Sequence, residues 1–145
     1  MRIVDANVLL YAVNEDAGHH AASREWLDRA LAGEDTVGFG WIAMLAFARL
    51  ATRRDLFTAP LSSAEALSQL DDWTSAPGGR VLHPGERHLG ILSSLLDELG
   101  SAGNLVNDAH LAALALEHRA SIVTYDNDFS RFRGVRWHTP DQLLT

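Results

Sequence analysis

The sequence predicts an α/β fold with three layers, in which helices cover both faces of a central, mainly parallel sheet and helix exceeds strand. Short apolar runs typical of buried strands alternate along the chain with longer segments of helical periodicity. Such alternation indicates parallel strands joined by right-handed crossovers. With 145 residues the chain has the length of one domain, so we expect a single domain over residues 1–145.

The first part of the chain shows this alternation from its start. The predicted elements are a strand at 2–5, a short buried helix at 6–13, a surface helix at 19–32, a strand and turn at 36–40, and a helix at 41–54. Gly33 closes the surface helix, and Gly38 and Gly40 are interpreted as a tight turn. Because helix 41–54 is apolar almost all round in its first two turns, we expect it to be largely buried.

The second part continues the pattern. The predicted elements are a helix at 63–75, a strand at 80–82, a helix from about 86 to 100, a helix at 104–119, a strand at 121–125, an edge strand at 136–138 and a turn from 140. A capping pattern starts the first of these helices at Ser62 or Ser63, with Glu65 in its first turn. The next helix, which Gly100 closes, carries leucines at helical spacing that are expected in the core: Leu89, Leu92, Leu96 and Leu99.

Composition excludes several kinds of chemistry. The chain has no cysteine, which excludes disulfides, thiolate metal sites and cysteine nucleophiles. All 12 residues of the Lys+Arg total are arginine, and without lysine neither a P-loop nor Schiff-base chemistry is available. No apolar run approaches the roughly 20 residues of a membrane helix, and the N-terminus lacks the apolar stretch of a signal peptide. We therefore expect a cytoplasmic protein without a membrane partner.

The charge balance limits how the chain can bind nucleic acid. A net charge of −7 at pH 7 argues against indiscriminate binding, because that affinity comes from basic side chains that release counterions. Two local basic clusters remain, one at a helix end and one after Asp128: Arg49, Arg53 and Arg54, and Arg131, Arg133 and Arg136. Taken alone, these clusters are interpreted as solvated charged faces.

Aspartates follow two of the predicted strands. Asp5 ends the first strand, and Asp126 follows a later one with Asp128 close behind. Because side chains at the carboxyl ends of the strands line the ligand crevice of an open α/β sheet, these aspartates are expected to converge. Asp108 interrupts the apolar face of helix 104–119, where a buried charge needs a partner.

Each aspartate also has an ordinary explanation. Asp5 can cap a helix, Asp126 and Asp128 can form a turn, and Asp108 can favour the positive end of a helix dipole. A metal site explains jointly why two strand ends and the first turns of a helix carry the same side chain. Carboxylate oxygens suit Mg²⁺ or Mn²⁺, and a metal-bound water can attack phosphorus. The pattern therefore points to metal-assisted hydrolysis of phosphodiester bonds.

Three stretches carry a resemblance to a known family: VDANVLLY at 4–11, NDAHLAALA at 107–115 and VTYDNDF at 123–129. Through them, in order and spacing and over essentially the whole chain, the sequence resembles the PIN-domain ribonucleases, and among these the VapC toxins of bacterial toxin-antitoxin pairs. The resemblance implies a Mg²⁺-dependent endoribonuclease with a PIN-like fold. It implies that Asp5, Asp108 and Asp126 bind the metal and activate water, which leaves a 5′-phosphate and a 3′-hydroxyl.

The same resemblance implies supporting residues and partners. Asn7 and Thr124 would orient the carboxylates through hydrogen bonds, although each also fits ordinary turn or strand chemistry. The implied partners are a cognate antitoxin protein that blocks the site, a structured RNA substrate of the tRNA or rRNA class, and a second copy of the chain in a homodimer. Phosphate contacts from the arginine clusters would have to guide RNA to an acidic site.

One departure from the family pattern concerns a glutamate. PIN nucleases of this kind usually carry a glutamate in the helix after the second strand, but helix 41–54 contains no acidic residue, and Phe47 or a neighbour occupies that position. Either Asp128 or the Glu15 and Asp16 pair substitutes, or the site holds one metal firmly and a second weakly. Asp128 is the favoured substitute because it lies at a strand end already near the site.

The missing glutamate leaves one alternative function open. A catalytically weakened PIN domain would bind RNA or a protein partner without cutting.

A dinucleotide-binding interpretation of residues 38–43, which fit G-x-G-x-x-G/A, has poor support because bulky Trp41 stands where a pyrophosphate would approach.

The histidines give no zinc motif. His110 and His118 are two turns apart on one predicted helix, roughly 12 Å by helix rise, which is too far to share a metal. His19 and His20, at a helix start, are expected to be exposed. A histidine-driven ribonuclease would need no metal and would leave a cyclic phosphate, so analysis of the product ends separates the two mechanisms.

Overall fold

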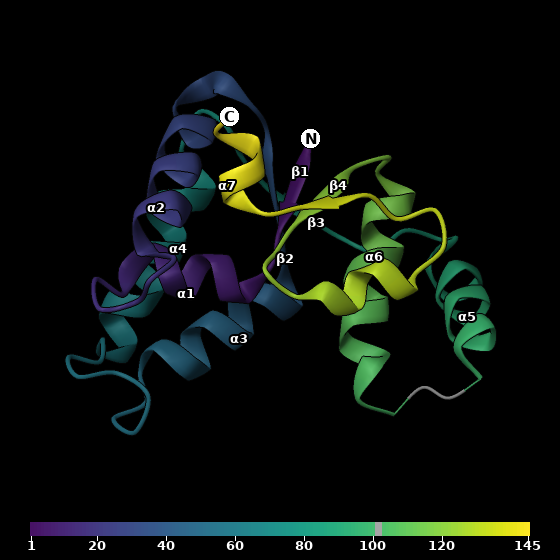
Figure 1. The fold of residues 1–145 in the computed structure, drawn as a ribbon, viewed down its shortest axis with the longest axis horizontal. Coiled ribbons are helices and arrows are strands. Elements are labelled where there is room, and N and C mark those ends of the chain that lie inside the picture. The colour runs from purple at the N-terminus through teal and green to yellow at the C-terminus, as the bar shows by residue number, and fades with distance from the viewer. Residues whose placement is uncertain (101–102) are drawn as a thin grey trace.

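The computed structural model describes residues 1–100 and 103–145, and it has the predicted three-layer α/β architecture (Figure 1). Five strands within the described residues form one sheet in the order β3-β2-β1-β4-β5, with every pairing parallel. They are β1 (Arg2–Val4), β2 (Val37–Gly40), β3 (Gly79–Leu82), β4 (Ser121–Val123) and β5 (Trp137–His138). Because the strands are parallel, their carboxyl ends lie along one edge of the sheet.

Helices connect the strands and cover both faces of the sheet. They are α1 (Ala6–Val13), α2 (His20–Arg29), α3 (Trp41–Ala51), α4 (Ser63–Ser75), α5 (His88–Leu99), α6 (Val106–Glu117) and α7 (Pro140–Leu143). A π-helical segment (Ala30–Glu34) and two 3₁₀ segments, Gly103–Leu105 and Asn127–Arg131, complete the connections. In Figure 1, α1 to α4 lie on one side of the sheet, and α5 and α6 lie on the other. None of the helices in the described part of the chain has the length and apolar character needed to cross a membrane.

Successive residues of the central strands pack into opposite cores. Val4 and Val123 belong to the core on the side of α1 to α4, whereas Ile3 and Ile122 belong to the core on the side of α5 and α6. All four side chains are fully buried. This is the two-residue period of a strand whose two faces are both covered, and it explains why these strands read as continuous apolar runs.

Two predicted turns are wrong. Gly38 and Gly40 lie within β2, and a Cβ atom at Gly38 would stand 2.5 Å from Leu82 Cδ1 of the neighbouring strand. The absence of a side chain at Gly38 therefore serves close packing beside Leu82. From Pro140 the chain forms α7, because Thr139 and Gln142 make a reciprocal capping box at its start.

Three side chains expected in the core are exposed. Leu89 is 80% exposed, Leu45 62% and Trp41 51%. Leu89 lies in the first turn of α5, and in that helix Leu95 is the buried leucine. Helix α3 packs inward through one face, which includes Met44 and Phe47. The apolar patterns of α3 and α5 therefore predicted more burial of these helices than the structure shows.

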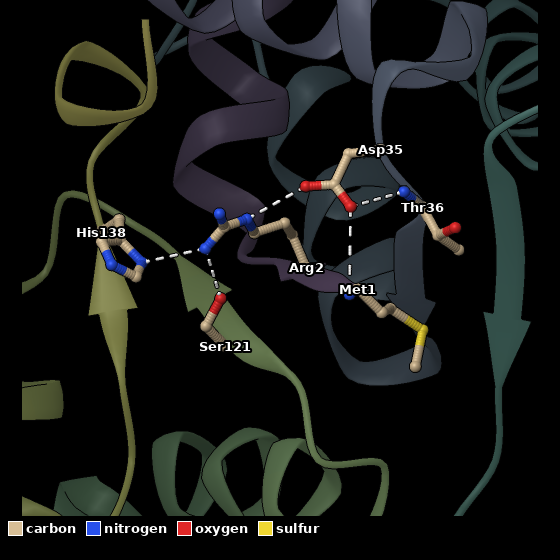
Figure 2. Close-up of polar contacts among 6 residues, drawn as sticks. All are labelled: Met1, Arg2, Asp35, Thr36, Ser121 and His138. Carbon is tan, nitrogen blue, oxygen red and sulfur yellow. Dashed lines mark hydrogen bonds and ion pairs between the residues drawn. The ribbon is translucent and has the colours of Figure 1, made fainter. Parts of the chain in front are cut away.

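Arg2 joins β1 to the segments on both sides of it (Figure 2). Its Nε donates to Asp35 Oδ2 at 3.1 Å, just before β2, and one terminal nitrogen donates to Ser121 Oγ of β4 at 2.9 Å. The same nitrogen lies 3.3 Å from His138 Nδ1 of β5. Burial lowers the pKa of His138, and Arg2 and Arg136 lower it further, so the neutral ring can accept a hydrogen bond from Arg2. This network ties together segments that hold the central strands in register.

Candidate metal centre

The carboxyl edge of the sheet brings together two acidic segments from opposite ends of the chain. Strands β1 and β4 are adjacent and parallel, with Val4 opposite Val123. The Asp5 N–H donates to the Val123 carbonyl at 3.0 Å, which extends the ladder by one step. Asp5 then starts α1, and Asp126 follows β4 after two residues.

Asp5 caps α1 and also belongs to a side-chain network. Its Oδ1 accepts from the Ala6 N–H at 2.7 Å, and its Oδ2 accepts from Thr124 Oγ1 at 2.8 Å and from Asn7 Nδ2 at 3.3 Å. Burial raises the pKa of Asp5, the hydrogen bonds from Thr124 and Ala6 lower it, and the nearby Asp126 carboxylate raises it. The helix cap expected as the ordinary explanation is therefore present, together with an environment that disfavours the negative charge.

Thr124 is the centre of this network. Its side chain is fully buried, and besides donating to Asp5 its Oγ1 accepts from Asn7 Nδ2 at 3.0 Å and from the Asp126 N–H at 3.0 Å. Asn7 Oδ1 accepts from the Tyr125 N–H at 3.2 Å. One hydroxyl thus fixes the Asp5 carboxylate and the backbone that carries Asp126.

Asp108, Asp126 and Asp128 form an acidic cluster, since each offers a carboxylate oxygen and these oxygens lie within 4.8 Å of one another. Asp108 lies in the first turn of α6, and the other two lie in the segment after β4. Asp126 Oδ1 accepts from the Asp128 N–H at 2.9 Å, so the turn chemistry expected for these residues also holds one carboxylate in place.

The negative charge of Asp108 is disfavoured by its surroundings. Burial, followed by the carboxylates of Asp5, Asp126 and Asp128, raises the pKa of Asp108 to about 6. Like charges this close disfavour one another, and a bound cation would relieve that repulsion. Four carboxylates form a set of hard oxygen donors that fits Mg²⁺ or Mn²⁺, and no thiolate is present in the chain to favour a softer ion. The donor chemistry of the site therefore fits a divalent cation.

The four predicted site residues do not hold equal positions. Asp108, Asp126 and Asp128 meet directly, whereas Asp5 stands next to them, close enough to raise the pKa of Asp108. Glu15 and Asp16 were the alternative source of the fourth acid. Within the described part of the chain, they do not belong to a group of acidic or histidine side chains whose ligand atoms lie within 4.8 Å of one another.

The position expected for a glutamate is apolar. Phe47 is fully buried on α3, and its ring meets Trp73 edge-on, with centroids 5.1 Å apart. Trp73 is also buried, at 7% exposure, so this part of α3 faces the core. The fourth acid near the cluster comes from the turn after β4 instead.

The arginines of the two predicted basic clusters differ in how free they are. Arg53 makes a two-point contact with the carboxylate of Asp55, through Nε at 2.9 Å and through a terminal nitrogen. Arg49, Arg131 and Arg133 are exposed. Arg53 is therefore less available to phosphate than sequence alone suggested.

A buried polar chain between α5 and α6 was not predicted. His88 Nδ1 lies 2.6 Å from Glu117 Oε1, and His88 Nε2 lies 2.9 Å from His110 Nδ1. Glu117 Oε2 accepts from the Gly85 N–H at 3.0 Å. These residues are far apart in sequence, so only the packing of α5 on α6 reveals that they meet.

Comparison with known proteins agrees with this geometry. The family model described as the PIN domain matches residues 2–135. Ribonuclease VapC37 of Mycobacterium tuberculosis is 58% identical over 144 residues, which cover 99% of this chain and 100% of that protein. Ribonuclease VapC31 of the same species is 41% identical over 97% of this chain and 99% of its own length.

Solved structures agree in fold. VapBC2 from Rickettsia felis, bound to a DNA fragment from its promoter, aligns with a TM-score of 0.67 and 19% identity over 95% of this chain and 97% of that chain. The sarcin-ricin loop cleaving toxin VapC20 of Mycobacterium tuberculosis aligns with a TM-score of 0.62 and 18% identity over 94% of this chain and 99% of that chain. At these identities the likeness concerns the fold alone.

Proposed function

This chain belongs to the PIN-domain family, and we propose from that premise that it is a Mg²⁺-dependent endoribonuclease of the VapC type, the toxin of a toxin-antitoxin pair. Full-length similarity to proteins named as VapC ribonucleases supports the activity. The observation that carries the metal dependence is the acidic cluster of Asp108, Asp126 and Asp128 with Asp5 beside it.

We assign metal binding to four carboxylates. Asp5, Asp108 and Asp126 are the catalytic residues, and Asp128 takes the part of the glutamate that α3 lacks. A divalent cation bound there supplies Lewis-acid stabilisation of the phosphate and lowers the pKa of a bound water. Mg²⁺ is the expected ion, and Mn²⁺ is a plausible substitute because it accepts the same oxygen ligands.

The chain's own residues hold the carboxylates in position. Thr124 and Asn7 donate to Asp5 Oδ2, which fixes that carboxylate against the end of β1. The Asp128 N–H occupies Asp126 Oδ1, and the Asp126 N–H is held by Thr124. A carboxylate held in this way can accept the proton of the attacking water without first reorganising. Hydrolysis by water would leave a 5′-phosphate and a 3′-hydroxyl.

The proposed partners follow from the relatives. A VapBC complex among the structural neighbours supports a cognate antitoxin protein. The similarity in fold to VapC20, a sarcin-ricin loop cleaving toxin, supports structured RNA of the rRNA or tRNA class. We further propose that residues 1–145 form a single PIN domain, that the chain acts as a homodimer, and that it works in the cytoplasm, where such RNA is found.

The test is metal-dependent cleavage of RNA. Purified protein is incubated with total RNA in Mg²⁺, in Mn²⁺ and in EDTA, with Asp5→Asn as the matched variant. We expect fragments with 5′-phosphate ends that require a divalent cation and that Asp5→Asn removes. Cleavage that persists in EDTA or in Asp5→Asn, or that yields cyclic phosphate ends, would contradict the metal mechanism.

One observation favours the alternative of a weakened site. Phe47, which is apolar and fully buried, occupies the position where related nucleases carry an acid. If the site is too weak to cut, the protein binds RNA or a protein partner without turnover. Single-turnover cleavage with protein in excess over RNA separates the two, because a slow enzyme still yields product and a binding module does not.

A further inference from the structure

Three aromatic rings from separate segments gather at Tyr125, the residue that precedes Asp126. Tyr11 lies on α1, His19 directly precedes α2, and Tyr125 stands between Thr124 and Asp126. The His19 and Tyr125 rings are stacked, with centroids 3.9 Å apart and an interplanar angle of 19°. Tyr11 packs against both, at 5.2 Å from His19 and 5.5 Å from Tyr125.

The inner part of this group is held by hydrogen bonds. The Tyr125 hydroxyl donates to Asp141 Oδ2 at 2.7 Å, and its backbone N–H donates to Asn7 Oδ1 at 3.2 Å. The Tyr11 carbonyl lies 2.8 Å from His20 Nδ1. The Tyr125 ring therefore has a fixed position relative to the strand end that carries Asp126.

The outer ring is open to solvent. His19 is exposed, although one face of its ring lies on Tyr125. It also makes no capping hydrogen bond to α2. The residue therefore stays exposed although Tyr125 covers one face of its ring and Tyr11 lies against it at a tilt.

We propose that His19 and Tyr125, which together we call the aromatic platform, bind an unpaired nucleobase of the RNA substrate by stacking on the part of the His19 ring that Tyr125 leaves uncovered. This inference rests on the proposed ribonuclease function. The Cα atoms of Tyr125 and Asp126 are about 3.8 Å apart, as for any consecutive residues. The Tyr125 ring of the platform is therefore carried by the same segment of chain as Asp126.

Stacking suits the charge of this protein. The chain carries a net charge of −7, and Arg53 is already engaged by Asp55, so fewer basic side chains are available to contact phosphate. Stacking on an aromatic ring needs no positive charge, and it tolerates any base because every base has a π face. Bases inside a duplex are covered on both faces, so the platform selects an unpaired nucleotide.

The test compares RNA with and without bases. Binding is measured by fluorescence anisotropy in Mg²⁺, with the Asp108→Asn variant used to prevent cleavage while leaving the platform unchanged. The two probes are fluorescein-labelled hexa-adenylate and a ribose-phosphate hexamer of the same charge that lacks bases. We expect hexa-adenylate to bind roughly tenfold more tightly, His19→Ala to remove that preference, and His19→Phe to retain it.

The matched control is His118→Ala, which removes a histidine side chain just past the opposite end of α6 from Asp108. It should leave the preference unchanged. Equal affinity for the two probes before His19 is altered would overturn the proposal. So would an equal loss for both probes in His19→Ala, because that result means a phosphate contact or a structural role. Thermal melting of each variant checks that it is folded.

The outcomes separate this inference from the proposed function. A base-dependent preference in a protein that never cuts total RNA would support the platform and contradict the nuclease. Metal-dependent cleavage by the protein with Asp108 intact, without any base preference in binding, would contradict the platform and leave the nuclease standing.

Discussion

The substitution Asp108→Asn should stabilise the metal-free protein and also abolish RNA cleavage. Asp108 is half-buried near Asp5, Asp126 and Asp128, so burial first, and then those three charges, disfavour its ionised form. Asparagine has nearly the same shape but carries no charge, and it is a poorer ligand for Mg²⁺ than a carboxylate. The carboxylate at this position therefore lowers stability without a cation and is needed for function with one.

The magnitude follows from the pKa of Asp108, which rises from 3.8 to about 6. At 1.36 kcal/mol per pH unit this rise corresponds to about 3 kcal/mol, which solvent screening at a partly exposed group reduces to about 1–2 kcal/mol. Because the folded-state pKa lies above the unfolded one, the folded protein holds the proton more tightly. The stability of the metal-free protein therefore falls as pH rises from about 4 through about 6, and the full penalty is present at pH 7.

Urea unfolding at pH 5, 6 and 7 in EDTA measures this effect. We expect Asp108→Asn to raise the free energy of unfolding at pH 7 by about 1–2 kcal/mol and by less at pH 5, and Mg²⁺ to stabilise only the protein with Asp108 intact. The control is Asp71→Asn, an exposed aspartate on α4, which should change stability by less than about 0.5 kcal/mol. A variant that is less stable than the unaltered protein at pH 7 would refute the reasoning.

Three further substitutions test other parts of the structure. Thr124→Val should weaken Mn²⁺ binding in calorimetry by roughly 10- to 100-fold, because the Asp5 carboxylate loses the hydroxyl that orients it. Thr124→Ser and the distant Thr74→Val should bind Mn²⁺ nearly as before. Unchanged Mn²⁺ affinity in Thr124→Val would show that the hydroxyl has only a packing role. Asp128→Asn should raise the Mg²⁺ concentration needed for half-maximal cleavage about tenfold, and unchanged metal affinity and cleavage would remove Asp128 from the site. Glu117→Leu should lower the free energy of unfolding by about 2–4 kcal/mol in a urea titration, because His88 and the Gly85 N–H lose their acceptor. Its control is Glu98→Leu at an exposed position of α5. An equal change in both variants would mean that the polar chain of Glu117, His88 and His110 does not contribute to stability.

The fold was predictable from the sequence because its elements have strong local patterns. Helix 6–13 and helix 63–75 have the predicted bounds, and the second has the reciprocal capping box of Ser62 and Glu65. The convergence of Asp5 and Asp126 followed from topology alone, since parallel neighbours end at one edge. What failed was the amount of burial: Leu89 has the spacing of a core face and Trp41 lies in an almost entirely apolar turn, but neither pattern says which neighbouring element covers a helix.

The contacts around the candidate site were only partly predictable. Thr124 and Asn7 entered through family resemblance, because nothing in their local sequence distinguishes a buried hydroxyl that links two strand ends from an ordinary strand residue. The chain of Glu117, His88 and His110 had no sequence signal, since it depends on how α5 packs on α6. Long-range side-chain networks require the relative placement of elements, and a periodic pattern does not encode that placement.

The source of the fourth acid follows from the same packing. Phe47 is fully buried against Trp73, so a glutamate there would have to lose its hydration among apolar side chains without a partner. Such a charge destabilises the fold by several kcal/mol. The substitution Phe47→Glu would therefore disrupt the packing of α3 against the core and would not restore a metal ligand. Asp128 avoids this cost because it is exposed on a turn, and its own N–H already holds Asp126. A fourth carboxylate from the turn after β4 therefore completes the proposed site without removing any residue from the core.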